Sequence, residues 1–113
     1  KVDIFLGIGG GPEGVLAASA LDSYSCHFQG RFIFKTKDEI NEAKKMGITD
    51  LNKKYELNEI VKGDSIFCAT GITQSDMLNG IKINQNNFTS QTLVTHKSSE
   101  LTEIINKTTS LEE

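Results

Sequence analysis

The sequence predicts an α/β fold, in which helices pack against a sheet. Three observations support this class. An apolar run at Val2–Ile8 leads directly into a glycine-rich loop, helix-forming residues follow that loop, and β-branched residues alternate with polar ones near the C-terminus. The 113 residues suffice for one small domain, so we expect residues 1–113 to form a single α/β domain. Because the chain opens at Lys1 without Met and Val2–Ile8 already resembles a core strand, we expect it to be a fragment of a longer protein.

Two helices are predicted from the residues at their ends. Pro12 fits the first turn of a helix, where its missing N–H has no cost, and the apolar residues that follow predict a helix over Pro12–Ser23. Thr36 and Glu39 have the spacing of a capping box, which predicts that a second helix begins there. Its predicted end lies near Met46, because Gly47 suits a left-handed C-terminal cap.

The remaining elements are predicted from shorter patterns. Gly30–Phe34 is a weak strand candidate and Asp64–Thr70 a stronger one. Ile81–Ile83 and Thr89–Thr95 alternate apolar and polar residues around an asparagine-rich turn, which predicts an antiparallel pair. A last helix is expected after Ser98 or Ser99, since Leu101, Ile104 and Ile105 would share one helical face.

Composition excludes several classes of partner. The formal charge is −3 and the basic residues are scattered, so we expect no nucleic-acid partner. No window approaches the roughly 18 apolar residues of a membrane helix, and the N-terminus lacks the zones of a signal peptide, so a cytoplasmic location without membrane contact is expected. Cys26 and Cys68 have no zinc-ligand spacing, and we expect buried or half-buried thiols.

The most informative segment is the glycine-rich loop Gly7–Gly14. A glycine-rich turn between strand and helix lets backbone N–H groups approach an anion, and the helix dipole favours negative charge there. Glu13 places a carboxylate beside this anion site, which makes sense if a divalent metal lies between carboxylate and phosphate. Two alternatives stay open: Glu13 as an acidic residue of the first helical turn, and a loop that is structural only.

A dinucleotide site is the strongest rival hypothesis for the same loop. The spacing of Gly9, Gly11 and Gly14 satisfies the G-x-G-x-x-G pattern. Pro12, however, removes an N–H donor, and the carboxylate of Glu13 would repel a pyrophosphate. A small nucleotide- or phosphate-binding module is therefore the alternative function.

The loop and the segments after it resemble one enzyme family. Ile8–Ala18, which reads Ile-Gly-Gly-Gly-Pro-Glu-Gly-Val-Leu-Ala-Ala, is similar to the Ile-Gly-Gly-Ala-Pro-Glu-Gly-Val segment of class II (GlpX-type) fructose-1,6-bisphosphatases, with Gly11 in place of Ala. The likeness continues through Gln29–Arg31, Met46–Ile48, Gly63–Asp64, Ile66–Thr73 and Ser90–Val94. It covers nearly the whole chain in order.

This resemblance implies the layered architecture of the inositol monophosphatase and fructose bisphosphatase group, with this chain as a C-terminal subdomain containing a mixed sheet. It implies hydrolysis of the 1-phosphate of fructose 1,6-bisphosphate in gluconeogenesis, with sedoheptulose 1,7-bisphosphate as a further substrate of some members. By the same resemblance Glu13 is a ligand of Mn²⁺ or Mg²⁺, and the backbone of Gly10 binds substrate phosphate. No catalytic residue is assigned within the chain. The other metal ligands would lie in a preceding N-terminal part, so the chain alone is expected to be inactive, and the enzyme is expected to be a homodimer or homotetramer.

The other polar residues give weaker signals. The hydroxyls of Thr70–Thr73 follow a strand and can face a site, although a turn is the slightly stronger interpretation. Arg31 is more often a solvated residue than a phosphate ligand. His27 and His96 lack a triad partner at recognisable spacing, and Asp64 is interpreted as a turn former outside the site.

Overall fold

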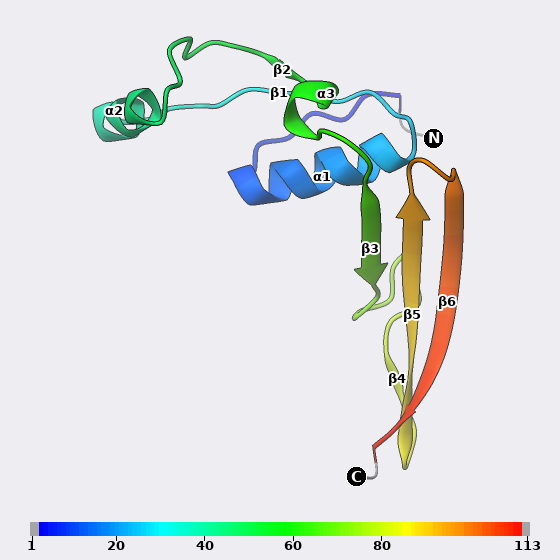
Figure 1. Cartoon of the computed structure of the whole chain (residues 1–113). Helices are drawn as coiled ribbons and strands as arrows, with labels where there is room; N and C mark the ends of the chain where they lie inside the picture. Colours follow the sequence, from blue (N-terminus) through cyan, green and yellow to red (C-terminus); the bar gives the residue numbers. More distant parts are fainter. Residues whose placement is uncertain (1–2, 112–113) are drawn as a thin grey trace.

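The computed structural model describes residues 3–111. These residues form three helices and six strands arranged around a four-stranded sheet and a separate two-stranded one (Figure 1). In chain order the elements are α1 (Gly11–Ser23), β1 (Gln29–Gly30), α2 (Lys37–Lys45), β2 (Tyr55–Glu56), α3 (Leu57–Ile60), β3 (Ile66–Thr70), β4 (Lys82–Ile83), β5 (Asn87–His96) and β6 (Leu101–Ser110).

Both helices predicted from their ends are present. Helix α1 has Gly10 in an extended conformation at its N-cap and Pro12 in its first turn, and it ends at Ser23 as predicted. In α2 the Thr36 side chain accepts a hydrogen bond from the Glu39 backbone N–H at 3.2 Å, and the Glu39 carboxylate accepts from the Thr36 backbone N–H at 3.2 Å. Gly47 after α2 has φ +88°, the left-handed conformation expected of a glycine C-cap.

The larger sheet has the order β3-β5-β4, and β6 lies along β5. The expected antiparallel pair is confirmed, because Lys82 and Ile83 lie opposite Thr89 and Phe88. Every strand pair within residues 3–111 is antiparallel, so the mixed sheet implied by the family resemblance is an antiparallel sheet here.

The prediction of a helix after Ser98 or Ser99 is wrong. Residues Leu101–Ser110 form β6, which pairs with β5 along its whole length, from His96 opposite Leu101 to Asn87 opposite Ser110. The physical reason is non-local. A tight turn, in which the Glu100 N–H donates to the Lys97 carbonyl at 3.1 Å, brings the chain back alongside β5, which pairs with it. β-Branched residues are abundant in this segment, and they favour a strand once such a partner is available.

Two predicted strands also differ from the structure. The part of Val2–Ile8 that lies within the described residues carries no strand, and Ile4, Phe5, Leu6 and Ile8 are each at least 80% exposed. Val2 itself lies outside the described residues. The weak strand predicted at Gly30–Phe34 is limited to β1, which pairs only with β2. A strand needs a hydrogen-bonded partner strand as well as an apolar sequence. Among residues 3–111, Ile4–Ile8 has no such partner, and Gln29–Gly30 pairs over two residues only.

The core of the described residues is small. Its buried apolar side chains are Ala18, Ala43, Leu78 and Leu93. The Cα radius of gyration is 18.5 Å, against roughly 13 Å for a compact domain of about 100 residues. Figure 1 shows the reason: α2 and the β1–β2 pair lie away from the sheet, while α1 packs across the ends of β3 and β5.

One buried carboxylate fixes α1 to the sheet. Asp22, 6% exposed, lies in the last turn of α1. It accepts hydrogen bonds from the Lys97 ammonium at 2.8 Å and from the Ser65 hydroxyl at 3.1 Å. The charge of Asp22 is therefore compensated, and the C-terminal end of the helix is held at the edge where β3 begins and β5 ends.

Candidate functional site

The glycine-rich loop lies directly before α1. Gly10 has φ −70° and ψ 159°, and its carbonyl accepts the first intrahelical hydrogen bond, from the Gly14 N–H at 3.0 Å. Each of residues 7–13 is exposed. The N-terminal turn of a thirteen-residue helix is thus open to an anion, as the sequence predicts.

The carboxylate of Glu13 folds back over this turn. A Cβ atom placed on Gly10 would collide with Glu13 Oε2, whereas one placed on Gly9, Gly11 or Gly14 would meet nothing within 4 Å. The structure therefore brings the two predicted site residues, Gly10 and Glu13, into direct contact. Because Oε2 is the end of an exposed side chain, an alanine at residue 10 would require the Glu13 carboxylate to move away from the turn.

A carboxylate oxygen is a ligand that Mg²⁺ and Mn²⁺ prefer, so the Glu13 side chain fits the role of one ligand to such a cation. Within residues 3–111 no group of three or more His, Cys, Asp or Glu side chains converges as a metal site. The remaining ligands of a cation at Glu13 would have to come from elsewhere. A carboxylate this close to the turn would repel a pyrophosphate that has no metal ion beside it, which counts against the dinucleotide alternative.

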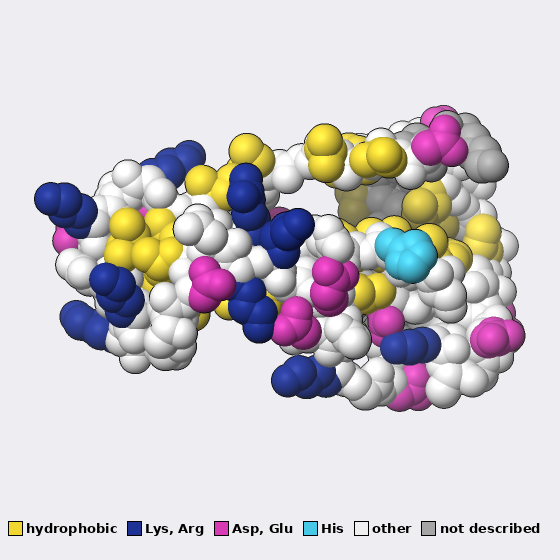
Figure 2. Space-filling model, turned by 90° about the horizontal axis from the view of Figure 1, so that it is seen from above, with side chains coloured by type: hydrophobic (Ala, Val, Ile, Leu, Met, Phe, Trp, Pro, Cys, Tyr) yellow, Lys and Arg dark blue, Asp and Glu magenta, His cyan; other side chains and the backbone are white. Residues whose placement is uncertain are grey.

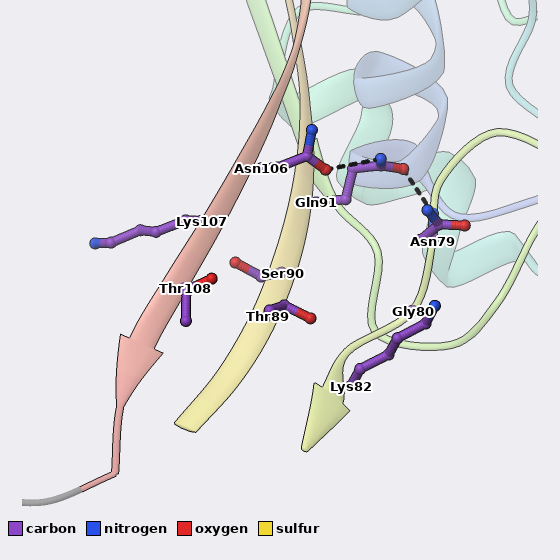
Figure 3. Close-up of a pocket in the computed structure, with 9 residues that line it drawn as sticks. All are labelled: Asn79, Gly80, Lys82, Thr89, Ser90, Gln91, Asn106, Lys107 and Thr108. Carbon is purple, nitrogen blue, oxygen red and sulfur yellow. Dashed lines mark hydrogen bonds between the residues drawn. The ribbon is translucent and has the colours of Figure 1, made fainter. Parts of the chain in front are cut away.

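A polar pocket lies between β4, β5 and β6, on a part of the sheet remote from the glycine loop (Figure 3). Its amide side chains are hydrogen-bonded to one another and to backbone: Gln91 Nε2 donates to Asn106 Oδ1 at 3.0 Å, and the Asn79 N–H donates to Gln91 Oε1 at 2.8 Å. Neither Gly10 nor Glu13 lines this pocket. Its hydrogen bonds join the loop before β4 to the sheet.

A second polar cluster was not predicted. Asp64 and His96, assigned no partner from the sequence, are hydrogen-bonded, with Asp64 Oδ2 and His96 Nε2 2.6 Å apart. Ser98 Oγ donates to the same Oδ2 at 2.7 Å, and His96 Nδ1 lies 2.8 Å from Ser99 Oγ. The hydrogen bonds from Ser98 and from His96 lower the pKa of Asp64 to about 2.

This cluster secures the turn between β5 and β6 to the start of β3. The Asp64 carboxylate also accepts from the backbone N–H groups of Ser65 and Ser98, at 3.0 and 3.1 Å, so its oxygens are engaged in structural contacts. His96 thus has a carboxylate partner that no sequence spacing indicated, because the two residues are 32 positions apart. Only the antiparallel register of β3 with β5 brings them together.

The other candidate residues occupy open positions. Thr70 bonds Thr92 across the sheet, with the two Oγ1 atoms 2.8 Å apart, and so takes part in a cross-strand contact. Arg31 and His27 are exposed. Cys26 and Cys68 are free and exposed, which corrects the expectation of buried thiols. Figure 2 shows scattered Lys and Arg side chains with Asp and Glu among them on the face in view.

None of the helices described is long and apolar enough to cross a membrane. Cytoplasmic location itself stays a prediction.

Comparison with known proteins identifies the family. Residues 1–109 match the family described as "Bacterial fructose-1,6-bisphosphatase, glpX-encoded". The chain is 34% identical over 108 residues to a "D-fructose 1,6-bisphosphatase class 2/sedoheptulose 1,7-bisphosphatase" of Thermosynechococcus vestitus, an alignment that covers 83% of this chain and 31% of that protein. Proteins with the same description from Prochlorococcus marinus strain MIT 9515 (35% identical over 103 residues; 79% and 31% covered) and a Synechococcus species (34% over 106; 82% and 30%) are similar.

The chain thus spans about 31% of the length of these relatives. The family match runs from the glycine loop through the four-stranded sheet and includes both Gly10 and Glu13. This chain belongs to the bacterial, glpX-encoded class II fructose-1,6-bisphosphatase family.

Proposed function

We propose that this chain is part of a divalent-metal-dependent phosphatase that hydrolyses the 1-phosphate of fructose 1,6-bisphosphate, as in gluconeogenesis, with sedoheptulose 1,7-bisphosphate as a second substrate. The observation that carries this proposal is the Glu13 carboxylate lying over Gly10 at the open N-terminus of α1. Anion-binding backbone and cation-binding carboxylate are adjacent there, as a metal-bound phosphate requires. The choice of substrates rests on the names of the similar proteins.

The two residues have different roles in this proposal. The backbone at Gly10 binds a phosphoryl oxygen of the substrate, aided by the positive end of the α1 dipole. The Glu13 carboxylate supplies one ligand to Mn²⁺ or Mg²⁺. When bound, the metal provides an activated water and neutralises charge on the phosphate. The other metal ligands would come from outside this chain, so we expect the 113-residue chain alone to release no phosphate.

The remaining part of the enzyme would complete the layered fold. Ile4, Phe5, Leu6 and Ile8 expose at least 80% of their surface immediately before the loop, and Figure 2 shows further apolar side chains open on the face in view. Apolar surface of this extent is normally covered in a native protein. Covering residues 4–8 with an N-terminal part of the chain would also position Gly10 and Glu13 against the other metal ligands. A cytoplasmic homo-oligomer, dimer or tetramer, is the proposed form.

The test measures Mn²⁺-dependent phosphate release from fructose 1,6-bisphosphate by the protein at its full native length. Glu13→Gln is expected to lower kcat/KM by about 100-fold or more, partly recovered at high Mn²⁺, because one metal ligand loses its charge. The matched control is Glu42→Gln, which removes an exposed carboxylate from α2 and should leave the rate unchanged. Full activity of Glu13→Gln would refute the metal role.

The loop can be tested separately with a matched pair of substitutions. Gly10→Ala places a methyl group against Glu13 Oε2, whereas Gly9→Ala places one in open space. We expect Gly10→Ala to raise KM and the Mn²⁺ requirement together, and Gly9→Ala to leave both essentially unchanged. Equal effects of the two substitutions would show that the contact between Gly10 and Glu13 has no functional role.

A further inference from the structure

Strand β6 is a long edge of the larger sheet. Its ten residues pair with β5 on one side, and no strand among residues 3–111 pairs with its other side. Thr109 is half-buried and the other residues of the strand are exposed. Figure 1 shows β6 at the outer margin of the molecule, with no helix beside it. Unpaired N–H and C=O groups along a strand of this length favour pairing with a further strand.

The outward backbone groups can be assigned from the register. Gly71 N–H donates to the Gln91 carbonyl and Lys97 N–H to the Ser65 carbonyl, so odd-numbered residues of β5 bond toward β3. The Leu111 N–H donates to the Asn86 carbonyl, which continues the alternation on the other side of β5. Because the β5–β6 register is unbroken, odd-numbered residues of β6 bond inward to β5. Even-numbered residues therefore direct their N–H and C=O groups outward; they include Thr102, Ile104, Asn106 and Thr108.

Two charged residues of β6 favour a second copy of β6 as the pairing partner. Glu103 and Lys107 are four residues apart on an extended strand, roughly 13 Å, too far to pair within one chain. Neither takes part in the ion pairs found within residues 3–111. In an antiparallel copy of β6 centred on Ile105, Glu103 of each chain lies directly opposite Lys107 of the other. The two-fold symmetry of this arrangement forms the ion pair twice.

That register also agrees with the backbone. It sets outward-bonding Ile104 opposite outward-bonding Asn106, which forms the hydrogen-bonded pairs. Glu103 and Lys107 then fall in the non-hydrogen-bonded pairs, where opposed side chains are closest. Shifting the register by one step of two residues keeps the hydrogen bonds but separates the charges. Figure 3 shows the Lys107 side chain extending from β6 on the side away from β5.

We propose that two copies of this chain associate by antiparallel pairing of β6 with β6 about a two-fold axis at Ile105. The two four-stranded sheets then form one continuous sheet across the interface. Ile105, 47% exposed in the single chain, meets its own copy at the axis. This interface uses no residue of the glycine loop and does not depend on the proposed enzymatic function.

Charge reversal tests the pairing. In the full-length protein, sedimentation analysis over a concentration series should show a dimer. Glu103→Lys or Lys107→Glu should raise the dimer dissociation constant about tenfold, since each places two like-charged pairs across the axis. The double variant, Glu103→Lys with Lys107→Glu, restores opposite charges and should restore the dimer. Glu42→Lys, on α2, is the matched control and should have no effect. A monomeric parent, or a double variant no better than the single ones, would overturn the proposal.

Disulfide trapping tests the register. In a Cys26→Ser and Cys68→Ser background, Ile105→Cys should form an intermolecular disulfide on mild oxidation, because self-opposed residues of a non-hydrogen-bonded pair have Cα atoms about 4.5 Å apart. Ile104→Cys is the control: it is similarly exposed, 52%, but lies diagonal to its own copy, about 7 Å or more away. Equal trapping at both positions would exclude this register. A dimer that traps at neither position would exclude the β6 interface.

Discussion

Removing Lys97 should destabilise the protein more than removing the charge of its partner, Asp22. Lys97→Met leaves the Asp22 carboxylate, whose side chain is 8% exposed, with the Ser65 hydroxyl as a remaining donor at 3.1 Å. An uncompensated buried charge costs about 3 kcal/mol or more. Asp22→Asn instead leaves Lys97, whose side chain is 41% exposed and can be solvated, so we expect a loss of about 1 kcal/mol.

The assay is urea unfolding followed by circular dichroism, which reports the free energy of unfolding. The double variant Asp22→Asn with Lys97→Met should lose clearly less than the sum of the two single losses, because no charge is then left buried. Lys44→Met, which removes an exposed ammonium from α2, is the control. The reasoning is refuted if Lys97→Met costs no more than Asp22→Asn, or if the two losses simply add.

Three further predictions concern other parts of the fold. Thr36→Ala removes the hydroxyl that accepts from the Glu39 N–H and should cost about 1 kcal/mol in urea unfolding; an unchanged midpoint would show that the capping box is dispensable. Gly71→Ala places a methyl group against the Asn79 carbonyl oxygen and should cost about 1–3 kcal/mol, since backbone must move; a loss below about 0.5 kcal/mol would contradict the packing. Folding lowers the pKa of Asp64 from 3.8 to about 2, so the stabilisation from its contacts is present above the unfolded pKa and is lost as pH falls toward 2. Amide signals of the β5–β6 turn in NMR spectra should follow that window, and signals that stay constant through it would contradict the assignment.

Local patterns were sufficient to predict α1 and α2. The hydroxyl of Thr36 and the carboxylate of Glu39 are three residues apart and satisfy each other's backbone donors, so the start of α2 could be predicted from the sequence. Pro12 similarly marked the start of α1. The candidate site was predictable for the same reason, because Gly10 and Glu13 are three residues apart and belong to one helical turn.

The wrong predictions concern segments whose structure depends on pairing with a distant part of the chain. Leu101, Ile104 and Ile105 have a spacing compatible with a helical face, yet they form a strand because β5 provides a partner along ten residues. The apolar segment Ile4–Ile8 has a strand-like sequence but no partner among the described residues, so it carries no strand. A strand depends on hydrogen bonds to another segment, and local sequence does not specify whether that segment is present.

The sequence by itself determined the termini of α1 and α2, the glycine loop with its carboxylate, and the family. The tertiary structure alone decided the pairing of β5 with β3 and with β6, the contact of Asp64 with His96 and the burial of Asp22 beside Lys97. These contacts join residues 32 and 75 positions apart in the chain. Such pairs leave no periodic signal in a sequence, because their separation is set by the register of strands and the docking of a helix rather than by the repeat of one element.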